Sequence, residues 1–87
     1  MTEKDRLKIA LTCLAGPGLE DQKRLLRQYS AFTPMGAEEE IATDDLEGMS
    51  EKWAFTTRDK LMEAVREGKE HFNFNEQGER VQFKLFD

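Results

Sequence analysis

Cysteine and histidine each occur only once in this sequence, as Cys13 and His71. A single cysteine can form no intrachain disulfide and no metal site with several thiolate ligands, which favours a reducing, cytoplasmic location. A reactive thiolate would need an electropositive, partly exposed setting and a nearby base, and no histidine is close to Cys13 in the sequence. We therefore expect Cys13 to behave as a small buried hydrophobic residue.

Long apolar stretches are also missing, and we expect no secretory leader. The longest uninterrupted apolar run is far below the ~18 residues of a membrane span. The N-terminus has no basic region followed by an apolar stretch and a small-residue cleavage site. Of the 87 residues, 36% are charged and 38% hydrophobic, a balance typical of a globular protein. We expect one domain over residues 1–87 and no membrane partner.

Prolines and glycines are few, and they mark helix ends. Gly16-Pro17-Gly18 follows leucines at helical spacing and predicts a first helix over about residues 3–15. Thr2 and Asp5 form an approximate capping arrangement at its start. The glycine-rich turn lacks the lysine and hydroxyl of a phosphate-binding loop, so we interpret it as a turn.

Two further helices are predicted. One covers roughly residues 19–31 and ends before Pro34, because the residue before a proline is driven out of the helical region. The other covers about residues 57–67 and begins at Thr56 or Thr57, each a good N-cap.

The C-terminal residues 69–87 predict a β-hairpin. Apolar and polar residues alternate on both sides of Gly78, and a turn with positive φ explains that glycine. Pairing Phe74 with Val81 places the apolar residues of both strands on one face. The predicted fold class is α+β: a small single domain of three helices followed by a C-terminal antiparallel β-hairpin packed on them.

The predicted core combines one face of each helix with the apolar face of the hairpin. Trp53 and Phe55 could be core or interface residues, and Phe86 points outward on this register. The core residues are Leu7, Leu11, Leu14, Leu25, Leu26, Tyr29, Phe32, Trp53, Leu61, Val65, Phe72, Phe74, Val81, Phe83 and Leu85.

The acidity is concentrated in one segment. Residues 36–56 carry seven acidic side chains against Lys52, a net charge of −6, whereas the whole chain has a net charge of −5. We expect residues 35–55 to be a loop with one short helix, with an acidic loop over 36–51. Its carboxylates do not follow the pattern of a calcium-binding loop. An acidic loop can steer association with a basic partner surface. The predicted partner-binding residues are Glu38, Glu39, Glu40, Asp44, Asp45 and Glu47.

An alternative interpretation is a winged-helix-like nucleic-acid-binding domain, with helix 57–67 as reader and the 70–86 hairpin as wing. The phosphate contacts would be Arg58, Lys60, Arg66, Lys69, Arg80 and Lys84. Against it, Asp59, Glu63 and Glu67 form an acidic stripe along the same helix. The connection between the second and third helices is also longer than a helix–turn–helix motif normally has.

The sequence predicts no catalytic residues, no cofactor and no metal site. His71 has only Glu70 and Lys84 as titratable neighbours on the predicted hairpin, so we expect a surface residue rather than a general base. The expected function is a non-enzymatic protein-interaction module, such as an adaptor, assembly component or inhibitor. Its partner would be another protein with a basic surface. Nucleic acid is less favoured, and an exposed Phe86 or hairpin edge could also form a homodimer.

Overall fold

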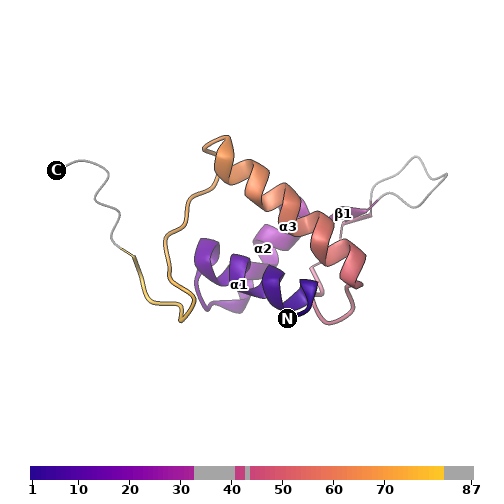
Figure 1. Ribbon diagram of the computed structural model, residues 1–87, viewed down its shortest axis with the longest axis horizontal. Helices are drawn as coiled ribbons and strands as arrows, with labels where there is room; N and C mark the ends of the chain where they lie inside the picture. Colours follow the sequence, from indigo (N-terminus) through magenta and orange to yellow (C-terminus); the bar gives the residue numbers. More distant parts are fainter. Residues whose placement is uncertain (33–40, 43, 82–87) are drawn as a thin grey trace.

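The computed structural model describes residues 1–32, 41–42 and 44–81. Its three helices are α1 (Glu3–Ala15), α2 (Leu19–Tyr29) and α3 (Glu51–Arg66), and Figure 1 shows α3 crossing above α1. Two-residue strands β1 (Ala31–Phe32) and β2 (Ile41–Ala42) pair antiparallel after α2. No helix in the described ranges is both long and apolar enough to cross a bilayer.

Helix α1 has the bounds that its sequence predicts. The Thr2 hydroxyl accepts the Asp5 N–H at 3.1 Å, and the Asp5 carboxylate accepts the Thr2 N–H at 3.2 Å, which completes a capping box. The Thr2 N–H lowers the pKa of Asp5, with a further contribution from the Thr2 hydroxyl. The helix ends at Gly16, where φ is +83° and the N–H donates to the Thr12 carbonyl.

Helix α2 ends two residues earlier than predicted. Ser30 is its C-terminal cap, in extended conformation, and its N–H donates to the Leu26 carbonyl. The next two residues belong to β1 instead of the helix, with Phe32 opposite Ile41. Extended backbone over residues 30–32 therefore ends α2 before Pro34.

Helix α3 begins six residues earlier than predicted. Ser50 is the N-cap, and its hydroxyl accepts the Trp53 N–H at 3.2 Å. Thr56 lies inside the helix, where its hydroxyl donates to the Lys52 carbonyl, and Thr57 is buried. The prediction that residues 51–55 are loop is therefore wrong, because the effective cap is Ser50 and both threonines lie within the first turns.

The predicted α+β class is wrong, because residues 69–81 do not form two paired strands. They make an irregular strap, defined here as residues 69–81, that runs from the end of α3 past the C-terminal end of α1 (Figure 1). Within the strap, the β-pairing is one isolated bridge, between Phe74 and Arg80. The described part of the domain is all-helical apart from this bridge and the short β1–β2 ladder.

The bridge also differs from the predicted register, which paired Phe74 with Val81. Asn75 explains the difference, because its side-chain oxygen accepts the N–H groups of Gln77 and Glu79 at 3.0 and 2.9 Å and closes a tight loop. Gly78 lies in that loop with φ of +83°, as predicted. Val81 is exposed rather than part of the core. Residues Phe83, Lys84, Leu85 and Phe86 lie outside the described residues.

Backbone hydrogen bonds to α1 give the physical reason for the strap. The last carbonyls of a helix have no partner within the helix. The Cys13 carbonyl accepts the N–H groups of both Asn73 and Phe74, each at 3.0 Å. These two N–H groups could have paired with the opposite strand of a hairpin, but they bind the end of α1 instead.

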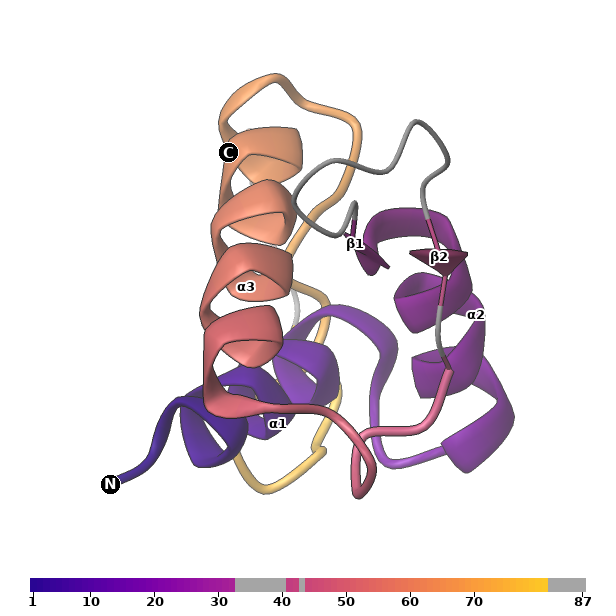
Figure 2. The same ribbon diagram turned by 90° about the vertical axis from the view of Figure 1, so that its right-hand side faces the viewer.

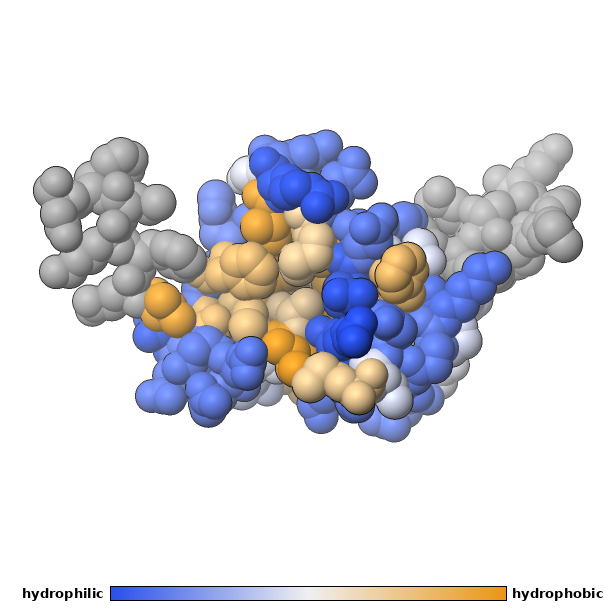
Figure 3. Space-filling model, in the orientation of Figure 1, coloured by the Kyte–Doolittle hydropathy of each residue, from blue (hydrophilic) through white to orange (hydrophobic). Residues whose placement is uncertain are grey.

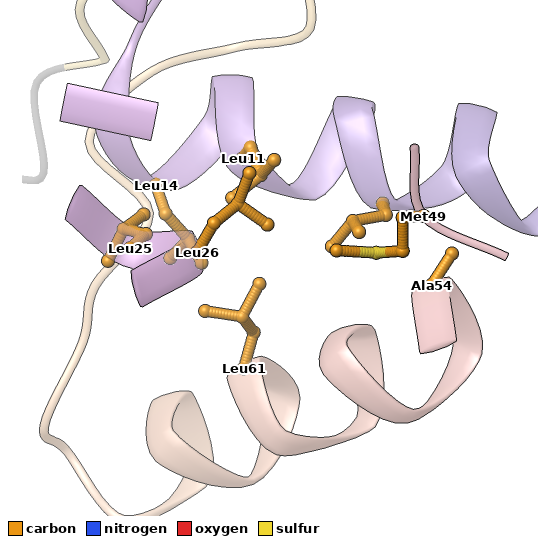
Figure 4. Packing of buried hydrophobic residues seen from close by; sticks show 8 residues of the cluster. Leu11, Leu14, Leu25, Leu26, Met49, Ala54 and Leu61 are labelled. Atoms are coloured by element: carbon orange, nitrogen blue, oxygen red, sulfur yellow. The ribbon is translucent and has the colours of Figure 1, made fainter. Parts of the chain in front are cut away.

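The core lies where the three helices meet. Figure 2 shows α2 and α3 standing side by side with α1 across their lower ends, and Figure 4 shows the leucines of all three helices pointing toward one another. The buried residues that the sequence predicted are Leu7, Leu11, Leu14, Leu25, Leu26 and Leu61. Full burial of each leucine contributes about 1.5–3 kcal/mol.

The rest of the predicted core has mixed outcomes. Four predicted core residues are half-buried against the cluster: Tyr29, Trp53, Val65 and Phe72. Phe74 is half-buried over Gly16, and the side chain of Phe32 lies outside the described part. The buried hydrophobic residues missing from the prediction are Ala10, Met49, Ala54 and Ala64. Their side chains are small or lie in the segment that was predicted to be loop.

Candidate protein-interaction surface

The acidic residues predicted to bind a partner are only partly described. Glu38, Glu39 and Glu40 lie outside the described residues. Asp44 accepts a hydrogen bond from the Arg27 guanidinium at 2.9 Å, forming an ion pair. Asp45 folds over Gly48, where a Cβ would lie 2.6 Å from the carboxylate oxygen.

Glu47 is exposed, and its backbone carbonyl accepts a hydrogen bond from the Lys4 ammonium at 3.0 Å. The described end of the acidic loop is thus attached to α1 and α2, and Asp44 has a basic partner within the chain.

A cavity of about 280 Å³ lies between this end of the acidic loop, α1 and α2. Leucines form part of its wall, and its charged lining contains both signs: Lys8 and Lys23 against Asp44, Asp45 and Glu47. No group of three metal-ligating side chains occurs among the residues that the structure describes. The mixed charge favours no single ligand class.

The basic residues of the nucleic-acid alternative do not form one free cationic face. Arg58 is paired with Glu3 at 3.0 Å and Lys69 with Glu67 at 2.9 Å, and the hydrogen bond to Glu67 raises the pKa of Lys69. Lys60 also has an interaction partner. Arg66 and Arg80 are exposed, whereas Lys84 lies outside the described residues.

A second surface is apolar, and the sequence did not predict it. A groove of about 270 Å³ runs between α1 and α3 and is closed at one end by the strap. Figure 3 shows apolar side chains gathered on this face of the molecule. The α1–α3 groove, as we call it, is lined by Arg6, Ile9, Ala10, Cys13, Arg58, Met62 and Phe72.

Helical spacing aligns these residues into two walls. Ile9 and Cys13 are four residues apart on α1, and Arg58 and Met62 are four apart on α3, so each pair lies on one helix face. The apolar stripes of both helices therefore extend beyond the residues that are buried in the core. Ile9, Cys13 and Met62 are half-buried at the edge of these stripes.

The strap supplies the remaining wall, and its position is fixed at two points. The N–H groups of Asn73 and Phe74 bind the Cys13 carbonyl, and the Tyr29 hydroxyl donates to the Glu70 carboxylate at 2.9 Å. Phe72 lies between these anchors and packs against the core cluster. The strap thereby places an aromatic ring at the Cys13 end of the groove.

The opposite end of the groove is charged. Glu3 divides its carboxylate between two arginines: Oε1 accepts from Arg6 at 3.2 Å, and Oε2 accepts from Arg58 at 3.0 Å. The Arg58 guanidinium also lies 5.7 Å from the centre of the Phe55 ring. The Nε of Arg58 is buried and has no hydrogen-bond partner in the described structure.

Cys13 and His71 differ in their surroundings. Burial raises the pKa of the Cys13 thiol, with a smaller contribution from Glu76, which keeps the thiol protonated. His71 is exposed, and the Asn73 amide donates to its backbone carbonyl. Trp53 packs on the core, whereas Phe55 is 52% exposed, so only Trp53 is a core residue.

No family model, no curated protein and no solved structure matches this chain in the three comparisons with known proteins.

Proposed function

We propose that this chain is a non-enzymatic protein-interaction module, acting as an adaptor, assembly component or inhibitor, and that the α1–α3 groove is its docking surface. The observation that carries the proposal is the residue composition of the groove. Its lining contains Met62, Phe72, Ile9 and two arginines, and no lysine or carboxylate from the described residues. Methionine, aromatic residues and arginine are enriched in protein interfaces, whereas lysine, glutamate and aspartate are depleted.

The open shape of the groove favours a protein partner over a small molecule. Pockets for small ligands enclose most of the ligand. The groove instead lies open on the molecular surface. A shallow apolar channel between two helices suits side chains that project from another protein.

The acidic loop has a secondary role in this proposal, which is to steer a partner with a basic surface. Exposed Glu47 supports the role, whereas Asp44 is already paired with Arg27. Charges at the rim of an interface change the association rate more than the affinity. Replacement of Glu38, Glu39 and Glu40 by glutamine should therefore slow the association of the partner and reduce the salt dependence of its association rate. A partner whose association rate is unchanged would contradict the steering role.

The pairing of Arg58 with Glu3 and of Lys69 with Glu67 favours a protein over a phosphate backbone as the partner. A single half-buried cysteine is consistent with a reducing, cytoplasmic location. Duplex DNA at low salt serves as the negative-control ligand, and we expect no gel shift with it. A gel shift that is lost when Arg58 and Arg66 are changed together would favour the nucleic-acid alternative instead.

The proposal is tested by comparing groove variants of the full chain. The protein, Met62→Glu and Ile9→Gln are used in parallel to capture partners, which are identified and purified. Binding of each purified partner is then measured by calorimetry, and the contact surface is mapped by NMR shifts. Leu19→Glu is the control, since Leu19 is exposed at the start of α2 and does not line the groove, and the change adds one negative charge, as Met62→Glu does.

We expect both groove variants to bind at least about tenfold more weakly, which corresponds to about 1.4 kcal/mol. The control should bind like the unchanged protein, and shifts should cluster at Ile9, Met62 and Phe72. Equal binding by all four proteins would refute the groove as docking surface.

A further inference from the structure

We infer that the segment docking in the α1–α3 groove is an amphipathic helix with a carboxylate near one end of its apolar face. This inference rests on the proposed function and adds the chemistry of the partner. Its basis is the uneven distribution of charge along the groove, since Arg6 and Arg58 line one end and share a single carboxylate, that of Glu3. This cationic lining occurs in a chain whose net charge is −5.

Both arginines lie at the same end of the groove. Arg6 comes one helical turn before Ile9 and Ala10 on α1, and Arg58 comes one turn before Met62 on α3. Their shared contact with Glu3 brings the two guanidinium groups together. Cys13 and Phe72 form the opposite end, which is apolar.

The distance between the charged end and the apolar end of the groove specifies the spacing of the matching side chains in the partner. Arg6 and Cys13 are two turns apart on α1, a separation of about 10 Å at 1.5 Å per residue. A partner helix that fills the apolar end with a large side chain would therefore carry its carboxylate two turns away. Helices that dock in grooves present their anchors at such i, i+3, i+4 and i+7 positions.

The arginines retain donors for a second carboxylate. A guanidinium has five N–H donors, and the described hydrogen bonds to Glu3 use one terminal nitrogen of each residue. Arg6 has 49% of its side chain exposed, so its other donors are open to solvent. Arginine binds carboxylates through two parallel hydrogen bonds, which gives both affinity and orientation. The buried Nε of Arg58 is a further donor that has no partner in the described structure.

The test is a selection from a displayed library of helical peptides. Each peptide has leucines fixed along one face, and the flanking positions are randomised among glutamate, glutamine and lysine. The library is sorted for binding to the full chain and counter-selected against Met62→Glu, with Ile9→Gln as a second counter-target. Circular dichroism verifies that every variant is folded.

We expect enrichment of peptides with glutamate two turns from a terminal leucine. The glutamate form of a selected peptide should bind about threefold to tenfold more tightly than its glutamine form at low salt. Arg6→Gln should remove most of this preference, while Arg24→Gln, an exposed arginine on α2, should not. Glu3→Gln should increase the preference, because it removes the carboxylate that now pairs with both arginines.

The other outcomes separate the inference from the proposed function. Enrichment of glutamine or lysine peptides that still require Met62 would overturn the acidic partner and leave the docking surface in place. Absence of any binder that distinguishes Met62→Glu and Ile9→Gln from the unchanged protein would overturn the docking surface itself. Self-association of the chain that Met62→Glu abolishes would assign the groove to a second copy and also overturn the inference.

Discussion

The ring of Phe74 lies directly over the backbone of Gly16, so close that a Cβ on Gly16 would be 3.0 Å from the ring. The contact joins the strap to the C-terminal end of α1. It lies beside the carbonyl of Cys13, which accepts two N–H groups from the strap. Gly16 therefore has two roles, since it ends α1 with a positive φ and leaves room for the aromatic ring.

Replacement of Gly16 by alanine tests both roles. An L-residue at the φ of +83° and ψ of −171° of Gly16, a region essentially confined to glycine, is destabilised by about 1–3 kcal/mol, and displacement of the Phe74 ring adds about 1 kcal/mol. Phe74→Ala provides the matched background, because Gly16→Ala meets no aromatic ring there and retains only the backbone cost. Urea unfolding should give a larger loss for Gly16→Ala in the unchanged protein than in the Phe74→Ala background. Equal losses would show that the Phe74 contact is unimportant for stability.

Ser50→Ala tests the early start of α3. Loss of the hydroxyl that accepts the Trp53 N–H should lower the free energy of unfolding by about 1 kcal/mol. Thr56→Ala should change it by no more than about 0.5 kcal/mol, since this hydroxyl bonds only within the helix. If thermal unfolding shows a larger loss of stability for Thr56→Ala than for Ser50→Ala, the result would support a helix that starts at residue 57.

Tyr29→Phe tests the anchor between α2 and the strap. Removal of the hydrogen bond to Glu70 should lower the free energy of unfolding by about 0.5–1.5 kcal/mol at neutral pH. Amide exchange should show faster opening of residues 70–74, whereas the amides of α1 near its N-terminus should be unaffected.

The same substitution predicts an alkaline pH dependence. Burial, and then the hydrogen bond to Glu70, raise the pKa of Tyr29 above its ordinary value of 10.0. The unfolded chain therefore loses this proton first, so the contribution of Tyr29 is complete below pH 10 and is lost as the pH rises through the folded pKa. The stability difference between the protein and Tyr29→Phe should shrink above pH 10. A difference that stays constant up to the unfolding limit would contradict the raised pKa.

Alkylation of Cys13 reports on the groove. Burial raises the pKa of this half-buried thiol, so at pH 8 iodoacetamide should react more slowly than with free cysteine. Phe72→Ala opens the adjacent wall and should accelerate the reaction, while Val81→Ala, a change at an exposed strap residue, should not. The rates are measured by mass spectrometry. A free-cysteine rate in the unchanged protein would contradict the partly covered position of Cys13.

The sequence was a good guide to elements with local signals. Thr2 and Asp5 cap α1 by bonding to each other's backbone, and Gly16 ends it, so all three signals lie within or next to the helix. The start of α3 was harder to predict because Ser50, Thr56 and Thr57 are all good caps. Packing decides among them, since Met49 and Ala54 are buried and bring the chain into the helix at Ser50.

The groove could be predicted only in part. Ile9, Cys13 and Met62 widen the apolar stripes of their helices, which is a signal visible in the sequence. Which of these residues are covered depends on how α1 crosses α3 and on where the strap places Phe72. The acidic loop gave a stronger sequence signal, yet Asp44 turned out to be paired with Arg27 from a helix seventeen residues earlier.

The sequence by itself determined that there are three helices, the bounds of α1, the leucine core and the need for positive φ at Gly78, because each depends on local caps, periodicity or a single backbone conformation. The tertiary structure decided the fate of the C-terminal segment. Alternating apolar residues suit a hairpin and a strap equally well, and the unpaired carbonyl of Cys13 at the end of α1 captured the two N–H groups that settle the choice. The same contact places Phe72 beside Cys13, and so the groove exists only in the folded chain.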